Sequence, residues 1–507
     1  MDYLDKQGNT NFLLWFRCKN CYSFAEESGF TMIARDNSGI DINHTININD
    51  MRILRVASVF GANASGKSNF FNVLSDMFHN IRGTRKRLLG RPYVFDNKLK
   101  DEPIHLEIAF CILGVNDEYM EYRYGYSLNY DNQKGFCNRI EGEWLTSRLF
   151  GSNDEYKDVF VRKGLELTIL DTGNNEINDF LTEAWNASIS KSDVEVTTCK
   201  TERECSLFLS WLYNKVKHLK SENDSLYQKY KNFLEIIISI YSWCVSSAPP
   251  YLFSDDEMKW QLKAIASKLA IADEKFKKSR KDDDYIRNKN EADEFKCDLT
   301  KFLRKFDTCI DGVAIIIPEK YKELLEVEDV DENHLRIIPV GVDAEEINKL
   351  EETLMLKQSF GTQKIASVYR FFWEAWRNGG LIMVDELDTK LHPTVIRELV
   401  ACFHSEIEKY KGQLIYSSHN CITLPNEIKP EDEKYYMHPD EVYFTIKQNN
   451  YDPNPGYSTI ERLVESFTAQ DTAEAIKNRS YRKKYEAGEY GTSPDYFNNL
   501  PGGRPTT

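Results

Sequence analysis

The feature that most constrains this chain is an eight-residue loop near its N-terminus. Residues 61–68 read Gly-Ala-Asn-Ala-Ser-Gly-Lys-Ser and fit the pattern GxxxxGK[ST]. The apolar run ILRVASVF at 53–60 leads into this loop, and the helix-compatible segment NFFNVLSDMF at 69–78 follows it. Glycines let successive backbone N–H groups turn inward, where they bind phosphate oxygens together with the positive end of the following helix. The loop therefore predicts a strand, a phosphate-binding turn and a helix, which together require an α/β fold.

Individual residues of this loop have separate predicted roles in holding a nucleoside triphosphate. Lys67 is expected to reach the β- and γ-phosphates, and the Ser68 hydroxyl is expected to bind the Mg²⁺ that bridges them. ATP and Mg²⁺ are accordingly the predicted cofactors. The predicted nucleotide-binding set here is Gly61, Asn63, Ala64, Ser65, Gly66, Lys67, Ser68 and Asn69.

A second apolar segment ends in two acids. Leu381–Val384 is followed by Asp385 and Glu386, so a buried strand would deliver both carboxylates to the carboxyl edge of a sheet. We expect Asp385 to hold Mg²⁺ and Glu386 to orient the attacking water and accept its proton. Such a pair, taken alone, is more often a helix cap or a loop. Together with the phosphate-binding loop it predicts a catalytic pair.

A histidine follows the next predicted strand. The segment Gln413–Tyr416 leads into Ser417, Ser418 and His419, which places an imidazole at the same edge of the sheet. A lone histidine is usually structural. In this position we interpret His419 as a contact to the γ-phosphate, and we count it with Glu386 among the catalytic residues.

Length and patterning predict the organisation of the chain. At 507 residues the chain exceeds one compact core and predicts two or three folding units. Residues 1–150 are predicted to hold the N-terminal half of the nucleotide-binding domain with an antiparallel β lobe. Residues 151–310 are charged and helix-favouring, interrupted at Pro249 and Pro250, and predict a helical insertion. Residues 311–507 return to alternating strands and helices and predict the C-terminal half of an α/β domain.

Composition restricts the class of protein and its compartment. Hydrophobic residues make up 41% of the chain and charged residues 29%, which excludes a disordered or fibrous protein. No apolar run is long enough to span a membrane, and the N-terminus shows no signal-peptide pattern. We therefore expect a cytoplasmic protein whose 11 cysteines are reduced. Cys18 and Cys21 could form half of a zinc site, but no second pair completes it, and we interpret them as a strand and its turn.

Charge limits contact with nucleic acid. The formal net charge of −15 predicts overall repulsion, so any such contact would need a local basic patch. Most basic runs are solvated faces of a protein. The candidate patches are Arg82, Arg85, Lys86, Arg87 and Arg91 after the phosphate-binding loop, and Arg479, Arg482, Lys483 and Lys484 near the C-terminus.

The ordered motifs GANASGKS, SFGTQK, LIMVDELDTKLHP and LIYSSHN resemble those of ABC-type ATPases of the SMC, RecF and OLD kind. More specifically, the chain is similar to the AAA-type ATPases of bacterial anti-phage and abortive-infection systems, the RloA, AbiL and PARIS AriA kind. Further similarities are NCYSF at 20–24, DEVYF at 440–444 and the tail YRKKYEAGEYGTSP from Tyr481. The resemblance covers both ends of the chain and leaves about 150–310 unassigned. It implies an α/β, ABC-type (SMC-like) P-loop domain with an antiparallel β lobe and a helical insertion.

The resemblance also implies roles for residues that spacing alone does not assign. It identifies 359–363 as the ABC signature, in which Ser359, Gly361 and Thr362 bind the γ-phosphate held by the loop of another subunit. Without it, this segment would be only a helix N-cap. Asp388 is similar to the D-loop residue that passes between two such sites. The Q-loop glutamine of this class has no clear counterpart, since the sequence between Asn72 and Leu145 offers only Gln133, in a polar loop.

Three functions are compatible with these motifs. The resemblance implies a homodimer or higher homo-oligomer bridged by ATP, which acts as sensor and scaffold and controls an effector protein encoded nearby. An alternative is a DNA-binding repair or recombination ATPase of the RecF or SMC kind, using the basic patches. A third is an OLD-like nuclease with a cryptic site in 150–310, which the absence of a DxD acid cluster after His419 disfavours.

Overall fold

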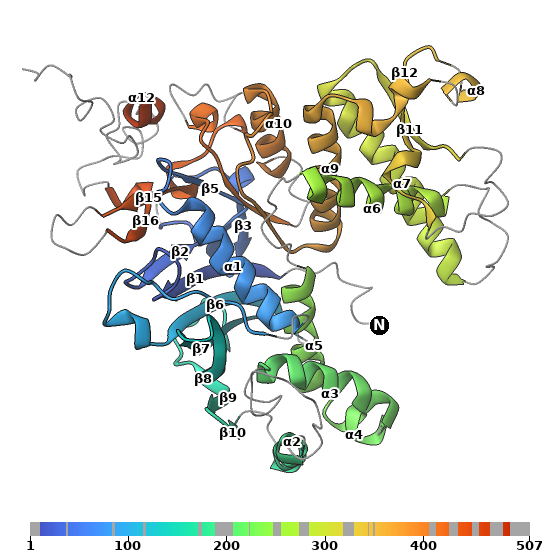
Figure 1. The fold of residues 1–507 in the computed structure, drawn as a ribbon. Coiled ribbons are helices and arrows are strands. Elements are labelled where there is room, and N and C mark those ends of the chain that lie inside the picture. The colour runs from blue at the N-terminus through green and yellow to red at the C-terminus, as the bar shows by residue number, and fades with distance from the viewer. Residues whose placement is uncertain are drawn as a thin grey trace, which may run out of the picture. The chain divides into compact units, whose positions relative to one another are not determined.

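The chain divides into two structural units. The first comprises Met1–Tyr251, Arg377–Leu387 and Ile396–Thr507, and the second comprises Leu252–Trp376 and Asp388–Val395. The computed structural model (Figure 1) describes residues 11–36, 39–83, 87–114, 118–170, 175–187, 206–222, 224–246, 255–272, 283–317, 329–342, 344–347, 350–404, 412–424, 434–448, 456–466 and 480–486. Arg85, Lys86, Pro249, Pro250, Arg479 and the tail after Glu486 lie outside these residues.

A five-stranded sheet forms the centre of the first unit. Its order is β13-β14-β5-β15-β16, and the first four strands are parallel, whereas β16 runs antiparallel to β15. The strands are β13 Leu381–Val384, β14 Gln413–Ser417, β5 Val56–Phe60, β15 Val442–Lys447 and β16 Ser458–Arg462. Every residue of β5, β13 and β14 is buried, as continuous apolar runs in a covered parallel sheet require.

Helix α1 (Lys67–Arg82) follows β5 and joins this sheet to the β lobe. It is amphipathic, with Phe70, Leu74 and Met77 on its buried face, and it ends at Gly83, whose φ of 65° lies in the left-handed region. Phe70 packs against Phe30 of β2, with ring centroids 5.1 Å apart. The helix is therefore covered by strands that lie far from it in the sequence.

An antiparallel sheet of seven strands forms the β lobe, in the order β10-β9-β8-β7-β6-β1-β2. The strands are β1 Phe12–Lys19, β2 Ser28–Thr31, β6 Ile104–Leu113, β7 Tyr119–Asp131, β8 Phe136–Leu149, β9 Lys157–Lys163 and β10 Glu166–Ile169. A separate hairpin pairs β3 Thr45–Ile48 with β4 Met51–Leu54. Cys18 lies in β1 and Cys21 in the following bridge to Phe24, both buried, which confirms the predicted strand and turn.

Helices begin later than the sequence predicts. The stretch 151–310 opens with β9 and β10, which extend the β lobe, because KDVFVRK buries its central apolar residues in the sheet. The helices that follow in the first unit are α2 Asn175–Ala187, α3 Phe208–Glu222, α4 Asp224–Lys229 and α5 Lys231–Ser246. Glu143 of β8 is fully buried and accepts the backbone N–H groups of Phe208 and Leu209, at 2.7 and 3.0 Å, so it stabilises the start of α3. The three-part division at 150 and 310 stays a prediction.

The second unit is mostly helical. It contains α6 Asp255–Ala272, α7 Asp283–Phe306, α8 Ala344–Ile347, most of α9 Phe360–Asn378, and a hairpin of β11 Ile310–Ile315 with β12 Leu335–Pro339. Aromatic rings fill its core, with Phe302 of α7 4.6 Å from Tyr369 of α9. Helix α10 (Pro393–His404) begins in this unit and continues in the first, and α12 spans Tyr481–Glu486. The predicted α/β class, with a β lobe and a helical insertion, is confirmed.

Among the described residues, no helix is both long enough and apolar enough to cross a membrane.

Candidate nucleotide-binding site

The loop between β5 and α1 has a backbone that glycine makes possible. Gly61 has a φ of 157° and Gly66 a φ of 116°, and Ala64 between them is also left-handed at 63°. A Cβ on Gly66 would lie 2.5 Å from Ser458 Oγ and 2.8 Å from Ser458 Cβ. The loop is therefore packed tightly against β16, and its curled shape fits the predicted phosphate-binding turn.

The lysine of this loop points back into it. Lys67 is buried, and its Nζ donates to the carbonyl oxygens of Gly61, at 2.7 Å, and Ala62, at 3.0 Å. The ammonium group thus lies inside the curve of the loop, where phosphate oxygens are expected to bind. Asn63, Ala64 and Ser68 are exposed, and Asn69 is half-buried in the first turn of α1.

A residue from a distant strand fixes the loop. Ser65 Oγ and Thr445 Oγ1 lie 2.6 Å apart, and Thr445 also donates to the carbonyl of Phe60 at 3.3 Å. Thr445 belongs to β15, which pairs with β5. The loop is consequently held from one side by β15 and from the other by the start of α1.

The acidic pair lies at the end of β13 and is held by one serine. Asp385 is buried, whereas Glu386 is exposed and has a φ of 52°, an unusual value for a residue with a side chain. Ser417 Oγ donates to Asp385 Oδ1 at 2.5 Å and accepts the backbone N–H of Glu386 at 2.7 Å. The carbonyl of Ser417 accepts the N–H of Leu387 at 2.9 Å. Ser417 therefore fixes both the buried carboxylate and the turn that presents the exposed one.

The sheet order brings these elements to one edge. Strand β14 lies between β13 and β5, with Val384 paired to Tyr416 and Ser417 paired to Val59. The acids and the loop thus follow parallel strands two positions apart, about 10 Å in the hydrogen-bonding direction. His419 is exposed two residues beyond the end of β14, at the same edge.

The predicted signature residues lie at the start of α9, in the second unit. Ser359 Oγ accepts the backbone N–H of Thr362 at 3.1 Å and lies 2.8 Å from the Thr362 hydroxyl, so Ser359 is the N-cap. Lys364 Nζ donates to the carbonyl of Thr389 at 2.8 Å, and Lys390 Nζ lies 3.5 Å from the centroid of the Phe360 ring. The N-terminus of α9 is therefore bound to the segment 388–391, which contains the predicted D-loop residue Asp388.

The chain matches a known protein family over the residues that form this site. Residues 56–424 match the family described as "AAA domain, putative AbiEii toxin, Type IV TA system". The chain belongs to this family. The match begins at β5, ahead of the loop, and extends past His419, so it includes the loop, the acids and α9.

The AAA-family chain also aligns with solved structures of SMC heads. One, an SMC head bound to the C-winged helix domain of ScpA, is 11% identical, with 90% of this chain and 99% of that chain covered and a TM-score of 0.38. Another, the SMC head domain from Thermotoga maritima, is 11% identical, with 89% and 98% covered and a TM-score of 0.30. The comparison with curated proteins gave no match.

Sequence reasoning missed several residues that hold the site from distant strands. Thr445 and Ser458 come from β15 and β16, and Ser417 is the last residue of β14. Ser23 lies in the NCYSF motif, and its carbonyl accepts the N–H of Ser458 at 2.8 Å beside Gly66. Serine and threonine residues within or at the ends of apolar strands are the sequence signal for such supporting residues. The signal does not show which residues meet, because that depends on which strands pair.

The basic patches are weaker in the structure than in the sequence. Arg82 is half-buried and donates to the carbonyl of Val245 at 2.9 Å, and burial lowers the pKa of its guanidinium. Arg482 pairs with Glu486 at 3.0 Å. Of the first patch, Arg87 and Arg91 are exposed. The Arg82 side chain is therefore partly drawn toward the end of α5, and contact of either patch with nucleic acid or a partner stays a prediction.

Proposed function

We propose that the protein is a cytoplasmic ATPase of the ABC type that binds ATP with Mg²⁺ and hydrolyses it. One observation carries the proposal: a curled loop with an inward lysine and a serine-fixed acidic pair follow parallel strands of one sheet. Membership of a family described as an AAA domain supports nucleotide binding. The exposed carboxylate of Glu386 supports hydrolysis, because it can act on a water molecule.

The residues at this edge can carry out each part of the reaction. Lys67 would exchange its two carbonyl partners for phosphate oxygens, and the loop N–H groups would bind the same phosphates. The Ser68 hydroxyl and the Asp385 carboxylate are hard oxygen donors of the kind that Mg²⁺ prefers. Bound there, Mg²⁺ would neutralise charge on the phosphates. Glu386 is exposed at the same edge and can orient a water molecule and accept its proton.

We further propose that two copies close around two ATP molecules. Ser359, Gly361 and Thr362 of one copy would contact the γ-phosphate bound by the other, and Asp388 would lie near the two-fold axis. The N-terminus of α9 has its own capping hydroxyls and backbone N–H groups, which suit an anion. The resemblance to ABC-type ATPases supports this arrangement.

The experiment is a measurement of mass with and without ATP. Glu386→Gln keeps a neutral isostere that cannot accept a proton, so it is expected to bind ATP without turnover and to form a stable dimer. Light scattering coupled to gel filtration should show a doubling of mass for this variant with Mg²⁺-ATP. Adding Ser359→Arg to it should restore the monomer while ATP still binds. Steady-state hydrolysis by Glu386→Gln would exclude Glu386 as the base, and a monomer at saturating ATP would exclude the ATP-bridged pair.

In the cell, we propose that this ATP-dependent assembly senses phage and controls a toxic effector encoded beside it. The support is the resemblance to anti-phage ATPases and the family description as a putative toxin of a type IV toxin–antitoxin system. Plating of phage on cells that carry the gene with its neighbours tests this role. Protection should require Lys67 and Glu386, and full protection by both substituted proteins would contradict it.

The runner-up is a DNA-repair ATPase of the RecF or SMC kind. The net charge of −15 and the internal bonds of Arg82 and Arg482 disfavour it. Binding of purified protein to duplex DNA at increasing salt separates the two functions, because phosphate contacts weaken steeply with salt. Tight, salt-sensitive binding that depends on ATP would favour the repair function.

A further inference from the structure

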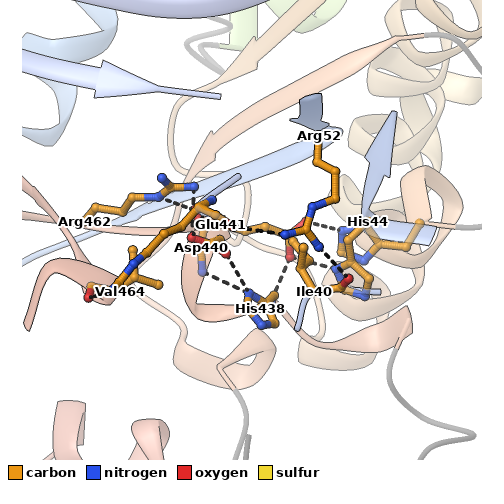
Figure 2. Close-up of polar contacts among 10 residues, drawn as sticks. Ile40, His44, Arg52, His438, Asp440, Glu441, Arg462 and Val464 are labelled. Carbon is orange, nitrogen blue, oxygen red and sulfur yellow. Dashed lines mark hydrogen bonds and ion pairs between the residues drawn. The ribbon is translucent and has the colours of Figure 1, made fainter. Parts of the chain in front are cut away.

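A second cluster of chemically reactive side chains lies buried in the first unit, away from the nucleotide-binding loop. It consists of His44, His404 and Glu441, which are 2%, 1% and 0% exposed. His44 ends the 3₁₀ helix Ile42–His44, His404 ends α10, and Glu441 directly precedes β15. Each residue offers one ligand atom, and these atoms all lie within 4.8 Å of one another. Figure 2 shows His44 and Glu441 in this cluster, with His438, Asp440 and Arg462 around them.

Hydrogen-bond accounting at His404 points to a positive charge in this cluster. His404 Nδ1 lies 3.0 Å from the carbonyl oxygen of Lys434, which can only accept, so Nδ1 carries a hydrogen. In the neutral ring, Nε2 then holds a lone pair. That nitrogen lies 3.0 Å from Glu441 Oε1, which is an acceptor in a carboxylate. Two acceptors at this distance require a proton or a metal ion between them.

The surroundings favour a metal ion over a proton. The His44 and His404 rings stack with centroids 3.9 Å apart, and both are buried. A proton on His404 would create an imidazolium in a dry site against a second imidazole, and burial disfavours that charge. A divalent cation keeps both rings neutral, takes one lone pair from each ring and one from the carboxylate of Glu441, and leaves one net positive charge spread over the three ligands. We propose that His44, His404 and Glu441 bind a divalent transition-metal ion of the Zn²⁺ class.

The ligand set and its supports suit such an ion. Imidazole nitrogen and carboxylate oxygen bind Zn²⁺ at about 2.0–2.2 Å, which places tetrahedral ligand atoms about 3.3–3.6 Å apart. The distances to Glu441 Oε1 and Oε2, 3.0 Å from His404 and 2.8 Å from His44, would lengthen by about half an ångström on binding. The Lys434 carbonyl on His404 Nδ1 is the kind of partner that orients metal-binding histidines.

The neighbouring residues His438, Asp440 and Arg462 contact one another. His438 Nδ1 lies 3.2 Å from the backbone N of Asp440, and Arg462 binds the Asp440 carbonyl at 2.7 Å and its carboxylate at 3.3 Å. These residues therefore enclose the site and are not its ligands. Glu441 Oε2 already accepts the backbone N–H of His438 at 2.7 Å, so three protein ligands leave a fourth position for a water molecule.

The first experiment measures metal in the full-length protein. Protein purified without a chelator or a nickel column, from zinc-supplemented cells, should hold about one zinc-class ion per chain by mass spectrometry. His404→Ala and Glu441→Gln should lose it. The matched control is His105→Ala, which removes a half-buried histidine of β6 bonded to Ser127. Asp385→Asn should also keep the ion, because it alters only the nucleotide site.

The second experiment stays decisive if those variants fail to fold. Wild-type protein stripped with a chelator and titrated with Co²⁺ should develop the visible bands of four-coordinate cobalt and regain its melting temperature. Metal-free wild-type protein with no cobalt bands and no change in melting temperature would overturn the proposal in favour of a proton bridge. Metal retained by both folded ligand variants, or a thiolate charge-transfer band that assigns it to Cys18 and Cys21, would overturn it as well.

Discussion

Ser417→Ala is the sharpest test of how the catalytic pair is held. The Oγ of Ser417 donates to the buried Asp385 carboxylate at 2.5 Å and accepts the Glu386 backbone N–H at 2.7 Å. Alanine removes both bonds and should leave the strand in place, because the backbone of β14 pairs with β13 over Gln413–Tyr416 and with β5 over Leu414–Ser417. The substitution therefore changes the orientation of two carboxylates without removing either.

The expected size follows from these two bonds. A hydrogen bond to a charged group contributes about 1.5–3 kcal/mol, and an N–H left without a partner costs about 1–3 kcal/mol. Glu386 is exposed, so water can replace part of the second term. We expect the free energy of unfolding to fall by about 2–4 kcal/mol. Each increase of about 1.4 kcal/mol in the activation free energy slows a reaction tenfold. We expect misplaced Asp385 and Glu386 carboxylates to raise that barrier by at least this amount, so ATP turnover should fall by at least about tenfold.

Denaturant unfolding and ATP hydrolysis as a function of Mg²⁺ concentration measure the two effects. Turnover should fall, and half-maximal activity should need more Mg²⁺, because Asp385 is predicted to hold the ion. The matched control is Ser418→Ala, whose hydroxyl is also buried and, among the residues that the structure describes, bonds Asn420 at 2.9 and 3.0 Å and neither acid. If the two variants have the same turnover and the same Mg²⁺ dependence, Ser417 does not position the acids and the reasoning is refuted.

The remaining predictions concern the loop itself. Lys67→Ala should weaken ATP binding by about 10- to 100-fold in a fluorescent-nucleotide titration, because one charge-assisted contact to the phosphates is lost; unchanged binding would contradict the role of Lys67. Gly66→Ala should abolish ATP binding and lower the melting temperature, since its Cβ would lie 2.5 Å from Ser458 Oγ at a φ of 116°. Thr445→Val should weaken ATP binding less than Lys67→Ala does, because it removes the 2.6 Å contact to Ser65 and the 3.3 Å bond to the Phe60 carbonyl but no group that binds phosphate; calorimetric titration of both variants gives the order.

The parts of the site that sequence reasoning predicts are those encoded locally. The eight residues of the loop contain the whole turn, since the glycines with positive φ and the lysine lie within one short segment. The run Leu381–Val384 likewise identifies a buried strand ending in acids. Each of these predictions needed only neighbours in the chain, and the α/β class followed from their order.

The parts that sequence reasoning missed depend on which strands pair. Ser417 meets Asp385 only because β14 lies beside β13, and Thr445 meets Ser65 across a sequence separation of 380 residues. The cluster at Glu441 joins His404, 37 residues away, and His44, 397 residues away. No local pattern contains such pairs. The late start of the helical insertion has a different cause, because the charged flanks of β9 concealed its apolar centre.

Strand β15 lies between the proposed metal cluster and the nucleotide-binding loop. Glu441 directly precedes β15, and Thr445, four residues later, holds the loop through Ser65. At about 3.3 Å per residue, the cluster lies about 13 Å from the loop along this strand, too far for one ion to serve both. A metal at Glu441 would therefore anchor the start of the strand that positions the loop, while Mg²⁺ at Asp385 would serve hydrolysis. Loss of the first should lower stability and leave the metal dependence of turnover unchanged, so either proposal can fail alone.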